Sequence, residues 1–112
     1  MQYALLIYDD PKSWENVTPE ELKSIYGEYM AVSELPATTG GAQLQPTEKA
    51  RSVRVKNGSP VVTDGPFAET KEILGGFYLI EAGSSAEAEE IAARIPSARM
   101  GGTVEVRPLV ER

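Results

Sequence analysis

Histidine and cysteine are both absent from this chain of 112 residues, and each absence removes a class of chemistry. Without cysteine there is no disulfide, no thiolate metal site and no thiol nucleophile. Without histidine, no side chain has an unperturbed pKa near neutrality, and neither a Ser-His-Asp triad nor a histidine metal site can form. Any general acid or base must be a carboxylate, a lysine, a tyrosine or a bound cofactor. We expect no metal and no cofactor.

Long apolar runs and an excess of positive charge are missing too. No apolar stretch approaches the 18 residues or so of a membrane-spanning helix, and no basic segment followed by an apolar one indicates a signal peptide. The net charge of −6 disfavours nucleic-acid binding, because neutralising phosphates requires a basic surface. We therefore expect a single domain over residues 1–112, located in the cytoplasm, that binds neither membranes nor nucleic acids.

Strand patterns and helix patterns alternate along the chain. Strands are predicted at residues 2–8, 50–56, 61–63, 76–82 and 102–107, and helices between Thr18 and Leu35 and between Ser84 and Ile95. Thr18 and Ser84 are each followed three residues later by a glutamate, which is typical of a helix N-cap. Asn57-Gly58 predicts a tight hairpin. We expect Thr38-Thr39-Gly40-Gly41 to form a flexible turn.

This order predicts an α+β fold of the ferredoxin-like βαββαβ type, with two helices on one face of an antiparallel sheet. The predicted strands 2–8 and 76–82 are apolar on both faces, whereas two helices can cover only one face. A second copy of the chain is the simplest cover for the other face, and we expect a homodimer. In the alternative, the chain is a monomer whose loop after residue 64 and termini cover that face.

The most informative segment is Asp64-Gly65-Pro66-Phe67-Ala68-Glu69-Thr70-Lys71-Glu72. It combines a rigid turn, a large apolar residue and a run of charges. Gly65 permits a positive φ, and Pro66 fixes its own φ and restricts the residue before it. A turn of this composition can also be purely structural.

This segment resembles the signature of the DGPF-motif branch of the YCII-related family. The resemblance extends over nearly the whole chain and includes Leu5-Leu6-Ile7-Tyr8, Leu44-Gln45-Pro46, residues 74–80 and residues 104–108. It implies a dimeric α+β barrel, in which two sheets pack face to face and leave a cleft on each subunit. Some branches of the family have a histidine paired with an acid that is proposed as catalytic. That pair has no counterpart here, because the chain lacks histidine.

Asp64 is the candidate catalytic residue, because it follows a strand and opens a rigid turn that would hold its carboxylate in one direction. Burial would raise the pKa of this carboxylate and backbone amides would lower it. The alternative is a turn-forming acceptor without a catalytic role. The candidate ligand-binding residues are Arg54, Tyr8, Phe67, Glu69, Lys71 and Tyr78. The alternatives are solvated charges for the ionic members of this set and core packing for the tyrosines.

Two classes of function are compatible with these features. Proteins of the dimeric α+β barrel type include lyases, isomerases and metal-free monooxygenases of cyclic or aromatic compounds. The resemblance therefore implies a cleft near the motif for a small organic acid or an aromatic ligand, with cofactor-free proton transfer or elimination by Asp64. The alternative is a non-catalytic regulatory module, because DGPF-type proteins often occur beside alternative sigma factors of bacteria or fused to them. The sequence leaves open whether the protein is an enzyme.

Overall fold

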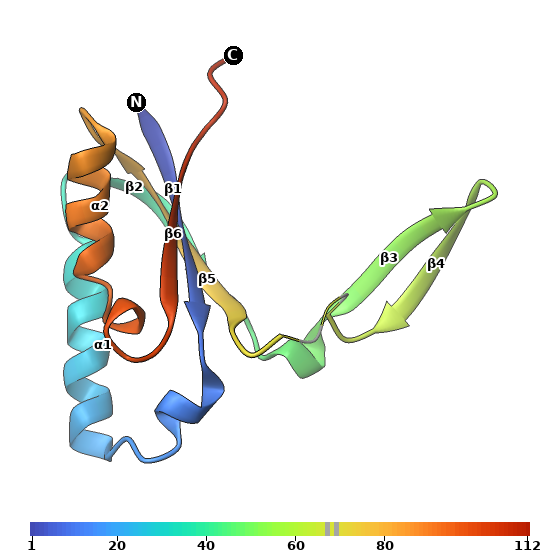
Figure 1. Cartoon of the computed structure of the whole chain (residues 1–112), viewed down its shortest axis with the longest axis horizontal. Helices are drawn as coiled ribbons and strands as arrows, with labels where there is room; N and C mark the ends of the chain where they lie inside the picture. The colour runs from blue at the N-terminus through green and yellow to red at the C-terminus, as the bar shows by residue number, and fades with distance from the viewer. Residues whose placement is uncertain (67, 69) are drawn as a thin grey trace.

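The computed structural model describes residues 1–66, 68 and 70–112. Four strands form an antiparallel sheet in the spatial order β2-β5-β1-β6. Their bounds are Gln2–Asp9 for β1, Thr38–Gln43 for β2, Ile73–Glu81 for β5 and Thr103–Pro108 for β6. The helices α1 (Pro19–Ser33) and α2 (Ser85–Ala93) lie on the same face of this sheet (Figure 1). The α+β, ferredoxin-like prediction is confirmed.

Both helices begin where the sequence predicts. The Thr18 hydroxyl accepts a hydrogen bond from the Glu21 amide at 3.1 Å, and Pro19 occupies the first turn of α1. The Ser84 hydroxyl accepts one from the Glu87 amide at 3.3 Å at the start of α2. Three short 3-10 helices, η1 (Pro11–Trp14), η2 (Thr47–Lys49) and η3 (Pro96–Ala98), connect the larger elements. Within the described residues, neither α1 nor α2 is long and apolar enough to cross a membrane.

The core lies between the sheet and the two helices. Tyr3, Leu5 and Ile7 alternate along β1 and are buried against the helices, together with Ile80 of β5. The intervening residues Ala4, Leu6 and Tyr8 therefore lie on the other face of the sheet. Phe77 and Leu79 of β5 lie beside them, because they pair with Leu6 and Ala4.

We call this second face, formed by Ala4, Leu6, Tyr8, Phe77 and Leu79, the open face. Neither α1 nor α2 covers it (Figure 1), and all of its members except Ala4 remain partly exposed to solvent. The sequence prediction that β1 and β5 are apolar on both faces is therefore correct, and one of these faces has no cover within the described part of the chain.

The prediction for residues 38–41 is wrong, because β2 occupies Thr38–Gln43 and pairs with β5. The segment has the composition of a turn, yet its glycines permit a close approach between these two strands. A Cβ on Gly41, whose φ is +152°, would lie 2.5 Å from the Phe77 carbonyl oxygen. A Cβ on Gly76 would lie 2.8 Å from the Ala42 carbonyl oxygen. The glycines are therefore required by the pairing of the strands and do not interrupt it.

The predicted strand at 50–56 exists as β3 (Arg51–Lys56), but it does not belong to the main sheet. It pairs only with β4 (Ser59–Asp64) within the described residues, which gives a separate two-stranded hairpin. Asn57 and Gly58 form its turn with φ values of 50° and 79°, as the sequence predicts. Figure 1 shows the hairpin extending away from the body of the molecule.

Leu5→Ala should lower the free energy of unfolding by about 2–5 kcal/mol, because Leu5 is completely buried and its truncation leaves a cavity. Urea denaturation followed by circular dichroism would measure the loss. Leu44→Ala is the control, since Leu44 is 42% exposed, and it should change the free energy by no more than about 0.5 kcal/mol. Equal losses in both variants would contradict this placement of the core.

Candidate functional site

A cavity of about 440 Å³ lies between α1 and the sheet, near the end of β1. Its volume falls within the range of about 300–1,000 Å³ that small-molecule sites occupy. Four aromatic residues line it from the side of the helices: Trp14 of η1, Tyr26 and Tyr29 of α1, and Tyr78 of β5. The cavity therefore has the size and the walls of a site for a small ring compound.

Asp9 is the acidic residue among those that line the cavity, and a hydrogen-bonded chain holds its carboxylate. The Ser97 hydroxyl donates a short hydrogen bond to Oδ1 of Asp9. The Tyr29 hydroxyl lies 2.5 Å from the oxygen of Ser97, and it acts as the donor because the proton of Ser97 already points to the carboxylate. Ser97 is only 1% exposed. This chain joins β1, η3 and α1 at one end of the cavity.

Gly75 provides the space for the second carboxylate oxygen. The pairing of β1 with β5 is irregular here, because Ile7 pairs with Gly76 and Tyr8 with Leu74, so Gly75 has no partner in the register. A Cβ on Gly75 would lie 2.5 Å from Oδ2 of Asp9. Any larger residue at position 75 would therefore displace the carboxylate from its place in the cavity wall.

Tyr29 and Tyr78 of the cavity wall keep their protons more firmly than a free tyrosine does. Burial raises the pKa of Tyr29 and outweighs the hydrogen bond with Ser97, which lowers it, and the negative charge of Asp9 raises it further. Burial also raises the pKa of Tyr78, with a further contribution from Tyr29. The Tyr78 hydroxyl donates to the Tyr29 carbonyl oxygen at 2.9 Å and so ties β5 to α1 across the cavity. Both phenols are therefore hydrogen-bond donors at neutral pH.

A second carboxylate, that of Asp10, supports the wall that carries Trp14. The Asp10 side chain accepts a hydrogen bond from the Lys12 amide at 3.1 Å and so caps the short helix η1, which ends at Trp14. The Lys71 ammonium lies 3.8 Å from Oδ2 of Asp10, whose side chain is only 12% exposed. The end of the motif segment therefore contacts the turn that positions Trp14.

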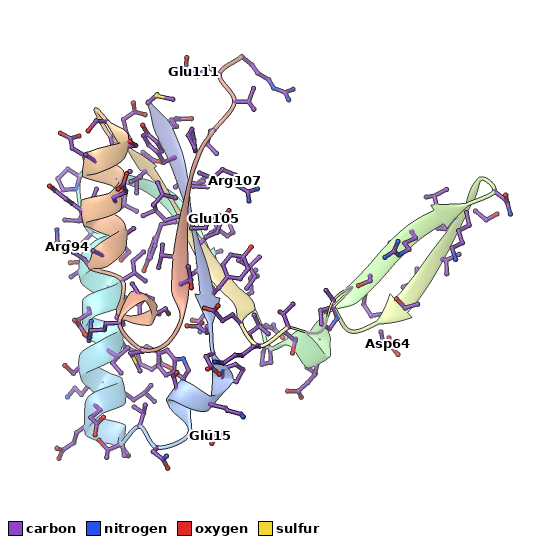
Figure 2. The ribbon with its side chains drawn as sticks, in the orientation of Figure 1. Glu15, Asp64, Arg94, Glu105, Arg107 and Glu111 are labelled. Carbon is purple, nitrogen blue, oxygen red and sulfur yellow. The ribbon has the colours of Figure 1, made fainter. Side chains whose placement is uncertain are left out.

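The predicted site residues are dispersed. Asp64 lies at the end of β4 with its side chain 88% exposed, and Arg51 pairs with it at 3.0 Å. Figure 2 shows it on the hairpin, away from the body of the molecule. Arg54 is exposed on the same hairpin, and Tyr8 lies on the open face. None of these three residues lines the cavity that the described residues form.

Two of the other predicted ligand-binding residues lie in or near the cavity. Tyr78 lines it, and Lys71 contacts the neighbouring turn through Asp10. Phe67 and Glu69 lie outside the described residues. The roles of these residues in binding, and that of Asp64 in catalysis, stay predictions.

Sequence reasoning missed Asp9, Ser97 and Tyr29 as a group. Asp9 directly follows the apolar strand predicted at residues 2–8, and a carboxylate at the end of such a strand is a signal for a functional residue. Ser97 lies 88 residues further along the chain, and no sequence pattern indicates that the two side chains meet. The 3-10 helix that starts at Pro96 is what brings the serine to Asp9.

The composition of the cavity wall restricts its chemistry. Among the described residues, no lysine or arginine lines the cavity. Nor do three or more acidic side chains gather anywhere in the described part of the chain as a metal site would need. What the wall offers to a ligand is aromatic surface and one carboxylate.

Tyr29 and Tyr78 should ionise at higher pH than an unfolded tyrosine, whose pKa is about 10. Because the pKa values in the folded state are the higher ones, the stability that they contribute is complete below about pH 10 and is lost as the pH rises further. Ultraviolet titration of the wild type and Tyr29→Phe checks this. The variant should have one fewer late-ionising group, and an unchanged number would contradict the burial of Tyr29.

The sequence matches one known family over its whole length. A family model described as the YCII-related domain matches residues 1–112. The curated "Uncharacterized protein R00369" of Rhizobium meliloti (strain 1021) is similar to this chain, with 40% identity over 114 residues that cover 97% of this chain and 92% of the relative. The family resemblance predicted from the motif is therefore confirmed, and the chain belongs to the YCII-related family.

Proposed function

We propose that the protein binds a small, neutral ring compound in the cavity beside α1 and that Asp9 exchanges a proton with it. The observation that carries this proposal is the positioned carboxylate of Asp9 in a cavity whose walls are aromatic. Trp14 and Tyr26 offer flat surfaces on which a ring can stack. This function falls within the class of cofactor-free proton transfer that the family resemblance implies.

The charge of the wall favours a neutral ligand over an organic acid. An anionic ligand would lie near the Asp9 carboxylate, and no lysine or arginine among the described lining residues would compensate its charge. Arg54, the predicted partner of an anionic group, is on the hairpin outside the cavity. Of the two ligand classes expected from the sequence, the aromatic one therefore fits better.

Asp9 suits the role of proton acceptor because its two oxygens have different surroundings. Oδ1 accepts the hydrogen bond from Ser97, and Oδ2 lies beside Gly75 in the cavity wall. The carboxylate is thus oriented by one oxygen and can react with the other. Asp64 offers no such arrangement, since it is exposed and paired with Arg51. The described contacts therefore favour Asp9 over Asp64 for this role.

We also infer that the protein is a homodimer in which the open faces of two copies pack together. Leu6, Phe77 and Leu79 form an apolar strip in the centre of this face. Glu105 and Arg107 of β6 lie at its edge on the side away from the helices (Figure 2) and form an ion pair at 2.7 Å. An apolar centre with a polar rim is the usual composition of an interface.

Regulation beside an alternative sigma factor is the second candidate function. Residues 64–67 read DGPF, and the family branch with this motif, which the chain resembles, often occurs beside such factors. The net charge of −6 also suits a basic protein partner. Such a role would need no proton transfer. The experiment below separates the two functions, because only the first requires a ligand in the cavity.

A thermal-shift screen that pairs neutral phenols with benzoates of the same ring should give hits among the phenols. A ligand at about 100 times its Kd stabilises the fold by about 2.7 kcal/mol. Gly75→Ala should abolish these hits, because the new Cβ displaces the Asp9 carboxylate. Hits confined to the benzoates would contradict the proposed ligand class, and no hit at all would favour the regulatory function.

Proton exchange is tested with neutral cyclic ketones, because a carboxylate can remove a proton from the carbon next to a carbonyl but not from the ring of a phenol. Nuclear magnetic resonance in D₂O should show loss of these carbon-bound protons with the wild type and no loss with Asp9→Asn. Asp64→Asn is the matched control, since it makes the same change on the hairpin, and it should behave as the wild type. The opposite result, with loss of exchange only in Asp64→Asn, would establish the prediction from the motif and overturn the role of Asp9.

Light scattering should give twice the chain mass of 12.1 kDa at micromolar concentration. Leu6→Lys should shift the protein toward the monomer, because a charge in the centre of the open face would have to be buried in the dimer. A wild-type mass of one chain would contradict the homodimer.

A further inference from the structure

The hairpin of residues 51–64, which we call the arm, gives the molecule an extended shape. The radius of gyration is 15.9 Å, compared with about 13 Å for a compact chain of this length. Each of its strands has six residues and so spans about 20 Å. Its hydrogen bonds and its ion pair join residues of the arm to one another or to its base at Ala50 and Gly65.

The two faces of the arm differ in character. Val53, Val55, Pro60 and Val62 share one face, since Val53 pairs with Val62 and Val55 with Pro60. We call this the valine face. Arg54 and Lys56 lie on the opposite face, together with Val61, which pairs with Arg54. We call this opposite face the Arg54 face. The arm is thus amphipathic, as a strand pair is when one face is packed against another surface.

Nothing among the described residues covers the valine face. Val53 is 61% exposed, Val55 is 70% exposed and Val62 is 48% exposed. An isolated two-stranded hairpin is at best marginally stable in water and needs packing against a further surface. The valine face therefore needs an apolar surface to pack against, and the described part of its own chain does not provide one.

The position and charge of the arm indicate which partner fits. In Figure 1 the arm and the helices project on opposite sides of the sheet, so the arm extends on the side of the open face. A second copy packed on the open face would lie within its reach. Residues 51–64 carry a net charge of +2, with three basic side chains and one acidic, whereas the rest of the chain carries −8. Opposite charges attract the arm to the body of another copy at long range, before the valine face makes contact.

We propose that the arm clasps the second subunit, with its valine face packed on the body of the partner and its Arg54 face directed to solvent. The inference rests on the proposed homodimer. Two-fold symmetry makes the contact reciprocal, so each subunit both extends an arm and receives one. The Arg51–Asp64 ion pair lies at the base of the arm and braces its two strands.

Neighbouring valines on opposite faces of β4 provide a matched test. Val62→Lys places a charge on the valine face, and Val61→Lys places the same charge on the Arg54 face of the same strand. Sedimentation equilibrium should show that Val62→Lys raises the dimer Kd at least about tenfold, because it removes a buried apolar contact from both arms. Val61→Lys should leave the Kd within about threefold of the wild type, a change of less than about 0.7 kcal/mol.

Amide hydrogen exchange on the same proteins reports on the arm itself. Residues 51–64 should be protected in the wild-type dimer and should lose this protection in Val62→Lys, while β1 and β5 stay protected and show that the body is folded. Equal protection of residues 51–64 in the wild type and in Val62→Lys would overturn the proposal.

The remaining outcomes separate this inference from the one on which it rests. A wild-type dimer that Val62→Lys does not weaken would overturn the clasp and leave the homodimer standing. The valine face would then be available to another class of partner, such as a sigma factor. A monomeric wild type would overturn both. Equal weakening by Val61→Lys and Val62→Lys would also overturn the clasp, because it would show an effect of charge that does not depend on the face.

Discussion

The central position of β1 in a sheet with two apolar faces is the constraint on which the rest of the structure depends. Its neighbours are β5 on one side and β6 on the other, so β1 determines the register of both. Alternation then directs Leu5 to the helices and Leu6 to the open face. Two helices cover the first face, and the second face is the physical reason for expecting a partner. The cavity lies near the end of this strand, and the open face includes its outward residues.

The cavity lies near the end of β1, beside the point between Ile7 and Tyr8 where its pairing with β5 becomes irregular. Gly75 leaves room beside the strand end, and Asp9 places its carboxylate in that room. Ser97 then holds the carboxylate, and Tyr29 in turn holds the Ser97 hydroxyl. A polar group at the edge of a core is costly unless its hydrogen bonds are made, and within the described residues no buried side-chain nitrogen or oxygen lacks a partner. The site is therefore held by the same contacts that close this end of the core.

Local signals predicted the parts of this fold that local interactions determine. The caps at Thr18 and Ser84 and the turn at Asn57-Gly58 are confirmed, because each needs only residues within one turn of helix or hairpin. The strand β2 was missed, because its six residues include two glycines and no large apolar side chain, and its conformation is fixed by pairing with β5 far along the chain. The Asp9–Ser97 contact was missed for the same reason, since it joins residues that no local pattern connects. The motif identified the family, whereas the cavity required the tertiary structure.

The motif segment, residues 64–72, connects the arm to the body of the molecule. At its start, the Gly65 amide donates to the Ala50 carbonyl oxygen at 2.8 Å, and the Ser52 hydroxyl donates to the Gly65 carbonyl oxygen at 2.8 Å, which closes the base of the arm. The φ of +88° at Gly65 is why this position needs glycine. At its end, Lys71 pairs with Asp10, beside the turn that holds Trp14. The described ends of the segment thus contact the base of the arm and, through Asp10, the short helix η1 that ends at Trp14.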